Sequence, residues 1–354
     1  MAALSWEKFL KQASQHTGAE HLDPDQPIAF DRSAWEAWWQ SELDRPLVMI
    51  EGYQPPESDT PPTSGSRPIK VPTLPENWTV DQTLDYFELW LGAKRYYGDA
   101  FPKWFPDLGS NGVAIFRGTK IQTTPGGEVW FLPDDAQSIA DIHVVYEENN
   151  YWWRRVRELT SAAIDRWQRR VVVGHVVLGG NLDILGAIRT TQQLALDMVD
   201  SPEEVSRLSA DIRRLWLRYY HELAQIIETN RLGTTNWAAI WSPLRTYMLQ
   251  SDFSYMISPR MFRQFVLPDL EECCCSLDHP FYHMDGKGQI NHLDMLLSIS
   301  NLKGIQWIPG AGQPPPEEWL PLLKKIRDGG KLCQLYVTPQ GARKIVRELV
   351  VCQA

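Results

Sequence analysis

The sequence lacks a long apolar segment and an excess of basic charge. Its longest apolar stretch, Val171–Leu178, holds eight residues, whereas a membrane-spanning helix needs about 18 or more. The 354 residues include 35 lysines and arginines against 44 aspartates and glutamates, which gives a net charge of −9. Proteins that bind nucleic acid have clusters of basic side chains on their surface. The sequence therefore predicts neither a membrane protein nor a nucleic-acid-binding protein.

Cysteines are few, and their arrangement does not form a regular framework. There are five, and three of them are adjacent at Cys273, Cys274 and Cys275. An odd number with such a run is not typical of a secreted, disulfide-bonded protein. The first 18 residues also lack the basic start and apolar core of a secretion signal. We therefore expect a reduced, cytoplasmic protein.

Two nucleotide-binding signatures are also missing, and the chain instead alternates strand and helix patterns. Neither G-x-G-x-x-G after a strand nor a P-loop occurs. Short apolar segments typical of buried strands alternate with amphipathic segments typical of helices. The expected strands include Val171–Leu178, Thr234–Ile240, Pro280–Met284, Gly304–Ile308, Leu332–Val337 and Leu349–Cys352, and the expected helices include Leu182–Met198, Pro202–Asn230 and Pro259–Leu277. This alternation predicts an α/β fold, specifically a (βα)8 TIM barrel.

The N-terminal part differs from this alternation. Trp35, Trp38 and Trp39 follow helical spacing, and Ser33 is a plausible N-cap. A segment rich in proline, serine and threonine follows over residues 52–76, which is typical of a loop. We expect a helical extension over residues 1–45 and a single barrel domain over residues 46–354.

Polar residues that follow the predicted strands are the first candidates for a functional site. In a barrel the site lies at the carboxyl ends of the strands. His283 and Asp285 are two positions apart at such an end, so their side chains face the same side of the strand. The pair can bind a metal ion or act as a general acid with its partner. The alternative is that Asp285 caps a turn and His283 is a hydrogen-bonded core residue.

Other strand ends contribute further candidates. Asp183 and Asp252 are candidate catalytic carboxylates, although each is also well placed to cap a helix or turn. Polar and aromatic residues near the same ends are candidates for binding substrate. These are Asn181, Gln250 and Gln313, with Trp237, Trp241, Tyr282 and Trp307 as pocket walls among 16 tryptophans, 12 tyrosines and 11 phenylalanines in the chain.

Several segments, taken in order, resemble the uroporphyrinogen decarboxylase superfamily, and within it the branch of corrinoid-linked methyltransferases and trimethylamine corrinoid proteins. The segments are DLGSNGVAIFRG, GEVWFLP, GGNLDILGAIRTTQQLALDMVDSPEEV, LQSDFSYMISPRMFRQFVLPDL, FYHMDGKGQINHLDMLL and IQWIPGAGQPPPEEW. The resemblance covers roughly residues 30–352 and implies a TIM barrel with its site at the carboxyl ends of the strands. The N-terminal arginine- and glycine-rich motif of the decarboxylases is absent, since EGYQPPES follows the first predicted strand.

The resemblance also implies a metal site. Methyltransferases of this branch hold zinc with a His-x-Cys motif and a later cysteine, which activates a thiol. His283 matches the histidine, Asp285 stands where the first cysteine would be, and Cys352 lies near the later cysteine. Replacing a thiolate by a carboxylate makes such a site harder. The expected ligands are therefore His283, Asp285 and Cys352, for zinc or another divalent metal.

Three functions remain open at this stage. The first is an enzyme that moves a methyl or similar small group from an oxygen-, nitrogen- or sulfur-linked donor to a corrinoid protein or a thiol, with Asp183, Asp252 and His283 as catalytic residues. The second is a metal-independent decarboxylase or lyase acting on a small carboxylate, with no cofactor. The third is a barrel that only binds a ligand. Any corrinoid would arrive on a partner protein, and the family forms both monomers and homodimers.

Overall fold

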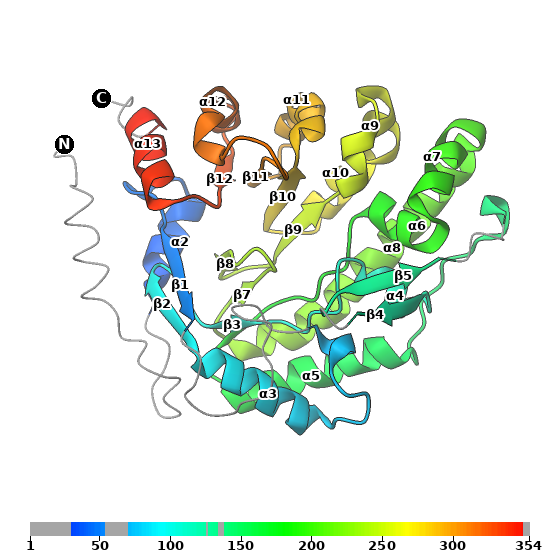
Figure 1. Ribbon diagram of the computed structural model, residues 1–354, viewed down its shortest axis with the longest axis horizontal. Helices are drawn as coiled ribbons and strands as arrows, with labels where there is room; N and C mark the ends of the chain where they lie inside the picture. Colours follow the sequence, from blue (N-terminus) through cyan, green and yellow to red (C-terminus); the bar gives the residue numbers. More distant parts are fainter. Residues whose placement is uncertain (1–29, 54–69, 125–126, 134–137, 350–354) are drawn as a thin grey trace.

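A parallel four-stranded sheet lies near the middle of a mixed α/β fold (Figure 1). This computed structural model describes residues 30–53, 70–124, 127–133 and 138–349. The sheet has the order β12-β11-β10-β9. Its strands are β9 (Thr246–Gln250), β10 (His279–Asp285), β11 (Gly304–Ile308) and β12 (Leu332–Gln334).

Helices connect these strands and cover the sheet, as expected for successive βαβ units. Figure 1 shows them side by side along the upper rim of the molecule. They are α9 (Pro259–Phe265) and α10 (Leu267–Cys275) before β10, α11 (Leu293–Ser298) before β11, α12 (Leu320–Asp328) before β12, and α13 (Pro339–Leu349) after it.

Shorter strand pairs continue the architecture. One pair is parallel, β3 (Lys103–Trp104) with β6 (Val172–Val173). Three are antiparallel: β1 (Met49–Tyr53) with β2 (Lys94–Gly98), β4 (Lys120–Thr123) with β5 (Val129–Leu132), and β7 (Thr234–Thr235) with β8 (Trp241–Ser242). The strands of the described residues thus form five separate sheets that do not close into a barrel.

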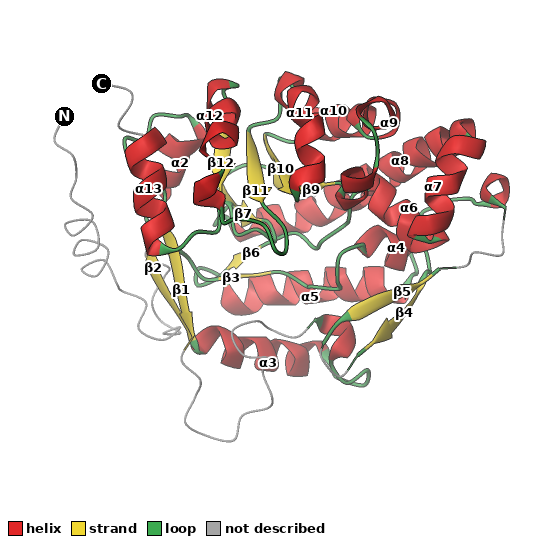
Figure 2. Cartoon of the chain, turned by 45° about the horizontal axis from the view of Figure 1, so that its top comes forward, coloured by secondary structure: helices red, strands yellow, loops and turns green. Residues whose placement is uncertain are grey.

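The remaining helices lie before β7 or mark short turns. The α-helices are α2 (Arg32–Trp39), α3 (Val80–Gly92), α4 (Gly112–Phe116), α5 (Tyr151–Trp167), α6 (Asn181–Arg189), α7 (Thr191–Asp200) and α8 (Pro202–Ile227). The 3-10 helices are η1 (Val71–Thr73), η2 (Ile139–Asp141), η3 (Glu228–Asn230), η4 (Asp252–Met256), η5 (Lys287–His292) and η6 (Pro316–Glu318). Helices α3 and α5 pack against each other (Figure 2).

Two predicted helices are each divided in two. The predicted helix Leu182–Met198 breaks at Thr190, whose φ of 86° lies in the left-handed region. The Thr190 hydroxyl then caps α7 by accepting the N–H of Gln193 at 3.1 Å. The predicted helix Pro259–Leu277 breaks at Val266, because Pro268 has no N–H to continue the helical ladder.

The predicted strands also need correction. Strand β6 covers only two residues of Val171–Leu178, and the chain of predicted strand Thr234–Ile240 turns back after Thr235 into β8. Strand β9 was not predicted. In the last predicted strand, Leu349–Cys352, the first residue ends α13, and the others lie outside the described residues.

The two faces of the central sheet pack against different cores. Tyr282, Met284 and Trp307 belong to the large core formed with the surrounding helices. On the opposite face, Met248 and Phe281 belong to a smaller core, which we call the inner core. The side-chain alternation of a strand accounts for this division, because successive residues point to opposite faces.

Helix α2, which lies within the predicted N-terminal extension, packs into the inner core. Its Trp35 and Trp39 are buried there, and Trp39 Nε1–H donates to the carbonyl oxygen of Trp241 at 2.9 Å. The helix begins two residues earlier than predicted, because the Asp31 carboxylate, rather than Ser33, caps it by accepting the N–H of Ala34. Residues 1–29 lie outside the described part of the chain.

Among the helices of the described residues, none combines the length and the apolar character required to span a bilayer.

Candidate functional site

A row of polar side chains crosses the central sheet near its carboxyl edge. Gln250, His283, Gln306 and Gln334 stand directly opposite one another on β9, β10, β11 and β12. One level nearer the amino ends, the same face carries the inner-core residues Met248, Phe281 and Leu332. Because residues two apart share a face, the polar row lies on the carboxyl side of an apolar floor.

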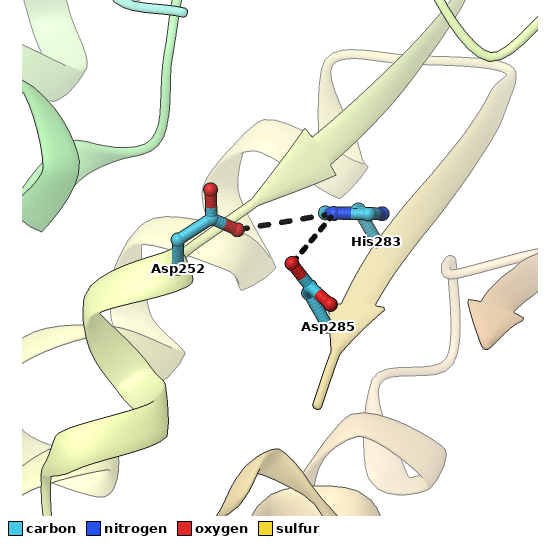
Figure 3. Close-up of side chains that lie close together, drawn as sticks. All are labelled: Asp252, His283 and Asp285. Carbon is cyan, nitrogen blue, oxygen red and sulfur yellow. Dashed lines mark ion pairs between the residues drawn. The ribbon is translucent and has the colours of Figure 1, made fainter. Parts of the chain in front are cut away.

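Two carboxylates approach the histidine of this row. The Nε2 atom of His283 lies 3.9 Å from Oδ1 of Asp252 and 3.9 Å from Oδ2 of Asp285. Figure 3 shows the three side chains pointing toward one another, Asp252 from the start of η4 and the other two from β10. One ligand atom from each of the three residues lies within 4.8 Å of the others. We call Asp252, His283 and Asp285 the carboxylate–histidine cluster.

A third carboxylate holds one member of this cluster in place. Asp183, near the start of α6, accepts the backbone N–H of Asp252 at 2.9 Å and that of Phe253 at 2.8 Å. These bonds satisfy N–H groups at the start of η4, which directly follows β9. The capping alternative for Asp183 is therefore realised, on η4 rather than on its own helix. Its position also fixes Asp252 beside the sheet.

The turn after β10 positions the second carboxylate. Asp285 is the last residue of β10, and the next N–H, that of Gly286, donates to the carbonyl oxygen of Ile308 on β11 at 2.7 Å. Gly286 has a φ of 80°, and a Cβ there would lie 2.8 Å from the ring of Tyr255. The tight turn therefore requires glycine and ends the strand with Asp285 facing Asp252.

Burial, together with the crowding of negative charge, raises the pKa of two of these carboxyl groups. Partial burial and the charge of Asp285 raise the pKa of Asp252 to about 6. Burial and the charge of Asp252 raise the pKa of Asp183 to about 7. Burial lowers the pKa of His283, so its imidazole is neutral at pH 7. The cluster thus combines a neutral nitrogen donor with carboxylates that a cation would stabilise.

A pocket of about 450 Å³ opens beside the cluster. Asp252 belongs to both, and Asp183 and Gln250 also line the pocket. The described lining residues include carboxylates, amides, hydroxyls and aromatic rings but no lysine, arginine or histidine. They are Ser110, Asn111, Trp130, Phe131, Pro133, Asp183, Gly186, Ala187, Thr190, Thr191, Gln250, Asp252, Phe253 and Met256.

The structure brings together most of the polar residues that the sequence singled out. Asp183, Asp252, His283 and Asp285 lie within one network, and Gln250 stands beside His283 in the polar row. The ring of Trp237 lies edge-on to the imidazole of His283, with 5.0 Å between ring centroids. Two predicted residues lie at the edges of this region. Asn181 is buried at the first turn of α6, and Gln313 lies in the loop after β11.

Three predicted pocket walls lie elsewhere. Tyr282 and Trp307 are fully buried in the large core, because they alternate with His283 and Gln306 and face the other side of the sheet. Trp241 lies in β8, where the chain has turned back, and its Nε1–H donates to the carbonyl oxygen of Leu232 at 2.8 Å. Cys352, the third predicted metal ligand, lies outside the described residues.

Two residues of the site, Gln306 and Gln334, were not predicted from the sequence. Gln306 is fully buried, and its Oε1 is hydrogen-bonded to Nδ1 of His283. Its Nε2–H donates in turn to Oε1 of Gln334 at 2.8 Å. The available signal was a single amide within an otherwise apolar strand, GIQWI, at a position that faces the same side as the histidine.

The carboxylate–histidine cluster fits a divalent metal ion. Zinc binds histidine nitrogen and carboxylate oxygen at about 2.0–2.2 Å, so two ligands of one ion lie roughly 3 to 4 Å apart. The separations of 3.9 Å from Nε2 to each carboxylate are of this size. Oxygen-rich donors of this kind suit zinc, manganese or iron better than a thiol-loving ion.

Comparisons with known proteins found little. No protein-family profile matches the chain. No curated protein sequence matches it either. Among solved structures, the chain is similar to a methyltransferase from Methanosarcina mazei, with a TM-score of 0.45 and 12% sequence identity over 71% of this chain and 81% of that one.

Proposed function

We propose that this protein is a metal-dependent enzyme that moves a methyl or similarly small group. The donor group is linked to oxygen, nitrogen or sulfur in a substrate held in the 450 Å³ pocket. The observation that carries the proposal is Asp252, which belongs both to the carboxylate–histidine cluster and to the wall of that pocket. A ligand in the pocket would therefore lie beside the cluster.

We further propose that the fold is a distorted (βα)8 barrel of the uroporphyrinogen decarboxylase superfamily. Its eight strands would be β1, β3, β6, β7 and β9 to β12. Parallel pairing joins β3 with β6 and unites β9 to β12. Backbone hydrogen bonds from Gly174 to Trp104 and from His175 to Thr235 extend β6 toward β3 and β7. The cluster lies at carboxyl ends of strands, where barrel enzymes carry their sites.

His283, Asp252 and Asp285 would hold the metal ion, most simply zinc or another borderline or hard divalent ion. When bound, the ion would supply Lewis acidity, polarising the atom that carries the transferred group. Asp183 orients Asp252 through the N-terminal turn of η4. With a pKa of about 7, Asp183 can also hold a proton near the pocket at neutral pH.

A thiol or a corrinoid carried by a partner protein would take the group, as the resemblance implies. Trp130, at the pocket edge, is 62% exposed, and Met256 is 60% exposed. An acceptor would therefore meet an apolar rim before it reached the cluster.

The two other functions receive less support from the pocket. A decarboxylase needs a cationic group for the carboxylate of its substrate, and the described lining residues supply none. A barrel that only binds ligand has no evident use for two carboxylates crowded around a neutral histidine, because their repulsion is costly without a cation.

Metal content tests the proposal directly. Protein purified without chelator or metal affinity resin should contain about one divalent ion per chain. His283→Ala and Asp285→Asn should each remove it, because each deletes one ligand of three. His143→Ala is the matched control, since His143 is exposed and far from the cluster in sequence. Asp294→Asn, with a side chain 82% exposed, controls for the loss of a carboxylate.

Activity is then sought with methyl donors and a reduced corrinoid or thiol acceptor, in the metal-loaded wild type and in Asp252→Asn. Turnover that requires both the metal and Asp252 supports the proposal. Decarboxylation by metal-free protein would overturn it in favour of the lyase. Ligand binding with no turnover under any condition would overturn it in favour of the binding barrel.

A further inference from the structure

The polar row contains a directed chain of hydrogen bonds that ends on His283. The chain begins at the carbonyl oxygen of Ala238, which accepts Nε2–H of Gln334 at 2.6 Å. Oε1 of Gln334 accepts Nε2–H of Gln306 at 2.8 Å. Oε1 of Gln306 is then the atom that meets Nδ1 of His283. The first contact joins the turn between β7 and β8 to β12, and the other two join β12 to β11 and β11 to β10.

The direction of this chain is fixed at its start. A carbonyl oxygen can only accept a hydrogen bond, so Gln334 must present its NH₂ group to Ala238. Its carbonyl oxygen then faces Gln306, which must likewise present its NH₂ group there. The free end of Gln306 is therefore its carbonyl oxygen, which accepts and does not donate. Rotating either amide by 180° would place like groups together and leave buried polar atoms unpaired.

The starting carbonyl is itself held rigidly. Ala238 lies in the turn between β7 and β8, where Ala239 has a φ of 66°. The side-chain Oδ1 of Asn236 accepts the N–H of Ala238 at 3.0 Å and that of Ile240 at 3.4 Å. Asn236 is only 1% exposed. These two hydrogen bonds fix the conformation of the turn, so that the carbonyl oxygen of Ala238 stays directed at Gln334.

We infer that Gln306 and Gln334 are positioning residues that hold His283 in the tautomer with hydrogen on Nδ1. An acceptor at Nδ1 requires a proton there, so a neutral His283 carries its lone pair on Nε2. Nε2 is the atom that faces Asp252 and Asp285, each at 3.9 Å. The isolated imidazole has no such restriction, so the two glutamines select the form that can bind a metal ion.

The edge-on ring of Trp237 adds to this restraint. Its centroid lies 5.0 Å from that of His283 with an interplanar angle of 80°, and it comes from the same turn that carries Ala238. The turn between β7 and β8 therefore fixes both the hydrogen bonding and the packing of the imidazole. The consequence for metal binding rests on the proposed function, but the tautomer itself does not.

The tautomer can be read from the two nitrogen signals of His283 in the metal-free protein. We would record long-range ¹H–¹⁵N spectra of protein labelled in histidine, with His283→Ala to assign the signals. The wild type should show a protonated Nδ1 and an unprotonated Nε2. Gln306→Leu should shift the population toward Nε2–H, and metal affinity should fall about 10- to 100-fold.

Two further variants separate positioning from simple destabilisation. Gln289→Leu is the matched control, because Gln289 is equally buried and its Oε1 accepts the hydroxyl of Tyr282, the neighbour of His283 on the other face. It should leave the tautomer unchanged. Gln306→Glu keeps an oxygen acceptor at Nδ1 but removes the donor to Oε1 of Gln334. It should preserve the hydrogen on Nδ1, because that hydrogen depends on the acceptor alone. If Gln306→Leu fails to fold, Gln334→Leu tests the same chain one step further from the imidazole.

A wild-type signal for Nε2–H, or an Nδ1–H form that persists in Gln306→Leu and Gln334→Leu, would overturn the inference. An Nδ1–H form in a protein that binds no metal would instead contradict the proposed function and support the inference. The two failures are therefore distinguishable.

Discussion

At the scale of single residues, Asp183 joins capping and proton binding in one side chain. Its two oxygens accept the N–H groups of Asp252 and Phe253, yet its pKa rises from 3.8 to about 7. A carboxyl group with a raised pKa binds more protons in the folded state than in the unfolded chain. Stability from this group is therefore lost as pH rises from about 4 to about 7.

Asp183→Asn tests this coupling in metal-free protein. The variant should be less stable than the wild type at pH 4.5, where Asp183 is protonated. The hydroxyl oxygen of a neutral carboxyl group can still accept an N–H, whereas the amide nitrogen of asparagine cannot, at a cost of about 1–3 kcal/mol. The difference should shrink as pH rises toward 8, since only the wild type ionises Asp183. Thermal midpoints measured across this range check the slope. A gap that stays constant with pH would mean that the pKa of Asp183 is not raised.

Predictions from the sequence were both most and least successful for single residues. The two-residue spacing of His283 and Asp285 was enough to place both on one face, because side-chain alternation in a strand is a local property. Gln306 could not be found in the same way. Its role depends on the register between β10 and β11, which no local pattern specifies.

At the scale of elements, the junction of α6 with β9 determines where the carboxylates lie. Gly180 precedes α6, and a Cβ there would lie 2.2 Å from the backbone oxygen of Gln250 and 2.5 Å from Oδ2 of Asp183. Gly180→Ala should therefore force the helix away from the strand, with a loss of about 1–3 kcal/mol as for other overpacked sites. Chemical denaturation measures the loss.

Gly92→Ala is the matched control for this substitution. Gly92 ends α3, and a Cβ there meets nothing within 4 Å. Because alanine favours the helix over glycine by about 1 kcal/mol, this variant should be as stable as the wild type or more so. A Gly180→Ala variant as stable as Gly92→Ala would show that the close approach of Gly180 to Gln250 does not exist in solution.

The boundaries of elements were harder to predict than their order. The apolar run Val171–Leu178 indicated a long strand, but beyond Val173 its carbonyl groups bond to another element. The N–H of Gly112 donates to Val177 O, and that of Val113 donates to Leu178 O, both at the start of α4. An apolar run marks burial, not the partner of its backbone. Conversely, β9, which carries Gln250 and leads to Asp252, was not predicted, although it pairs with β10 over its whole length.

At the scale of the whole molecule, a metal ion bound by the cluster should add to the stability of the complete fold. The ligands come from η4 and from β10, which the chain connects through α9 and α10. Unfolding separates them, so a bound ion favours the folded state. At a concentration of 100 times its dissociation constant, the ion would contribute about 2.7 kcal/mol. The thermal midpoint should rise with metal concentration in the wild type and in His143→Ala, and stay level in His283→Ala.

The pH dependence of metal binding follows from the ionisation of the carboxyl groups in and beside the cluster. Metal binding requires an ionised Asp252, whose pKa without metal is about 6, so the ion must displace protons below that pH. Affinity measured by calorimetry should therefore weaken about tenfold for each pH unit below 6, and rise only slightly between pH 7 and 8, where Asp183 completes its ionisation. Asp183 is not among the three residues that would hold the ion. Asp183→Asn removes one nearby negative charge. It should lower the metal affinity above pH 7 and leave the loss of affinity below pH 6 unchanged. If the loss of affinity below pH 6 disappeared in Asp183→Asn but persisted in Asp252→Asn, then Asp183 rather than Asp252 would be the metal ligand.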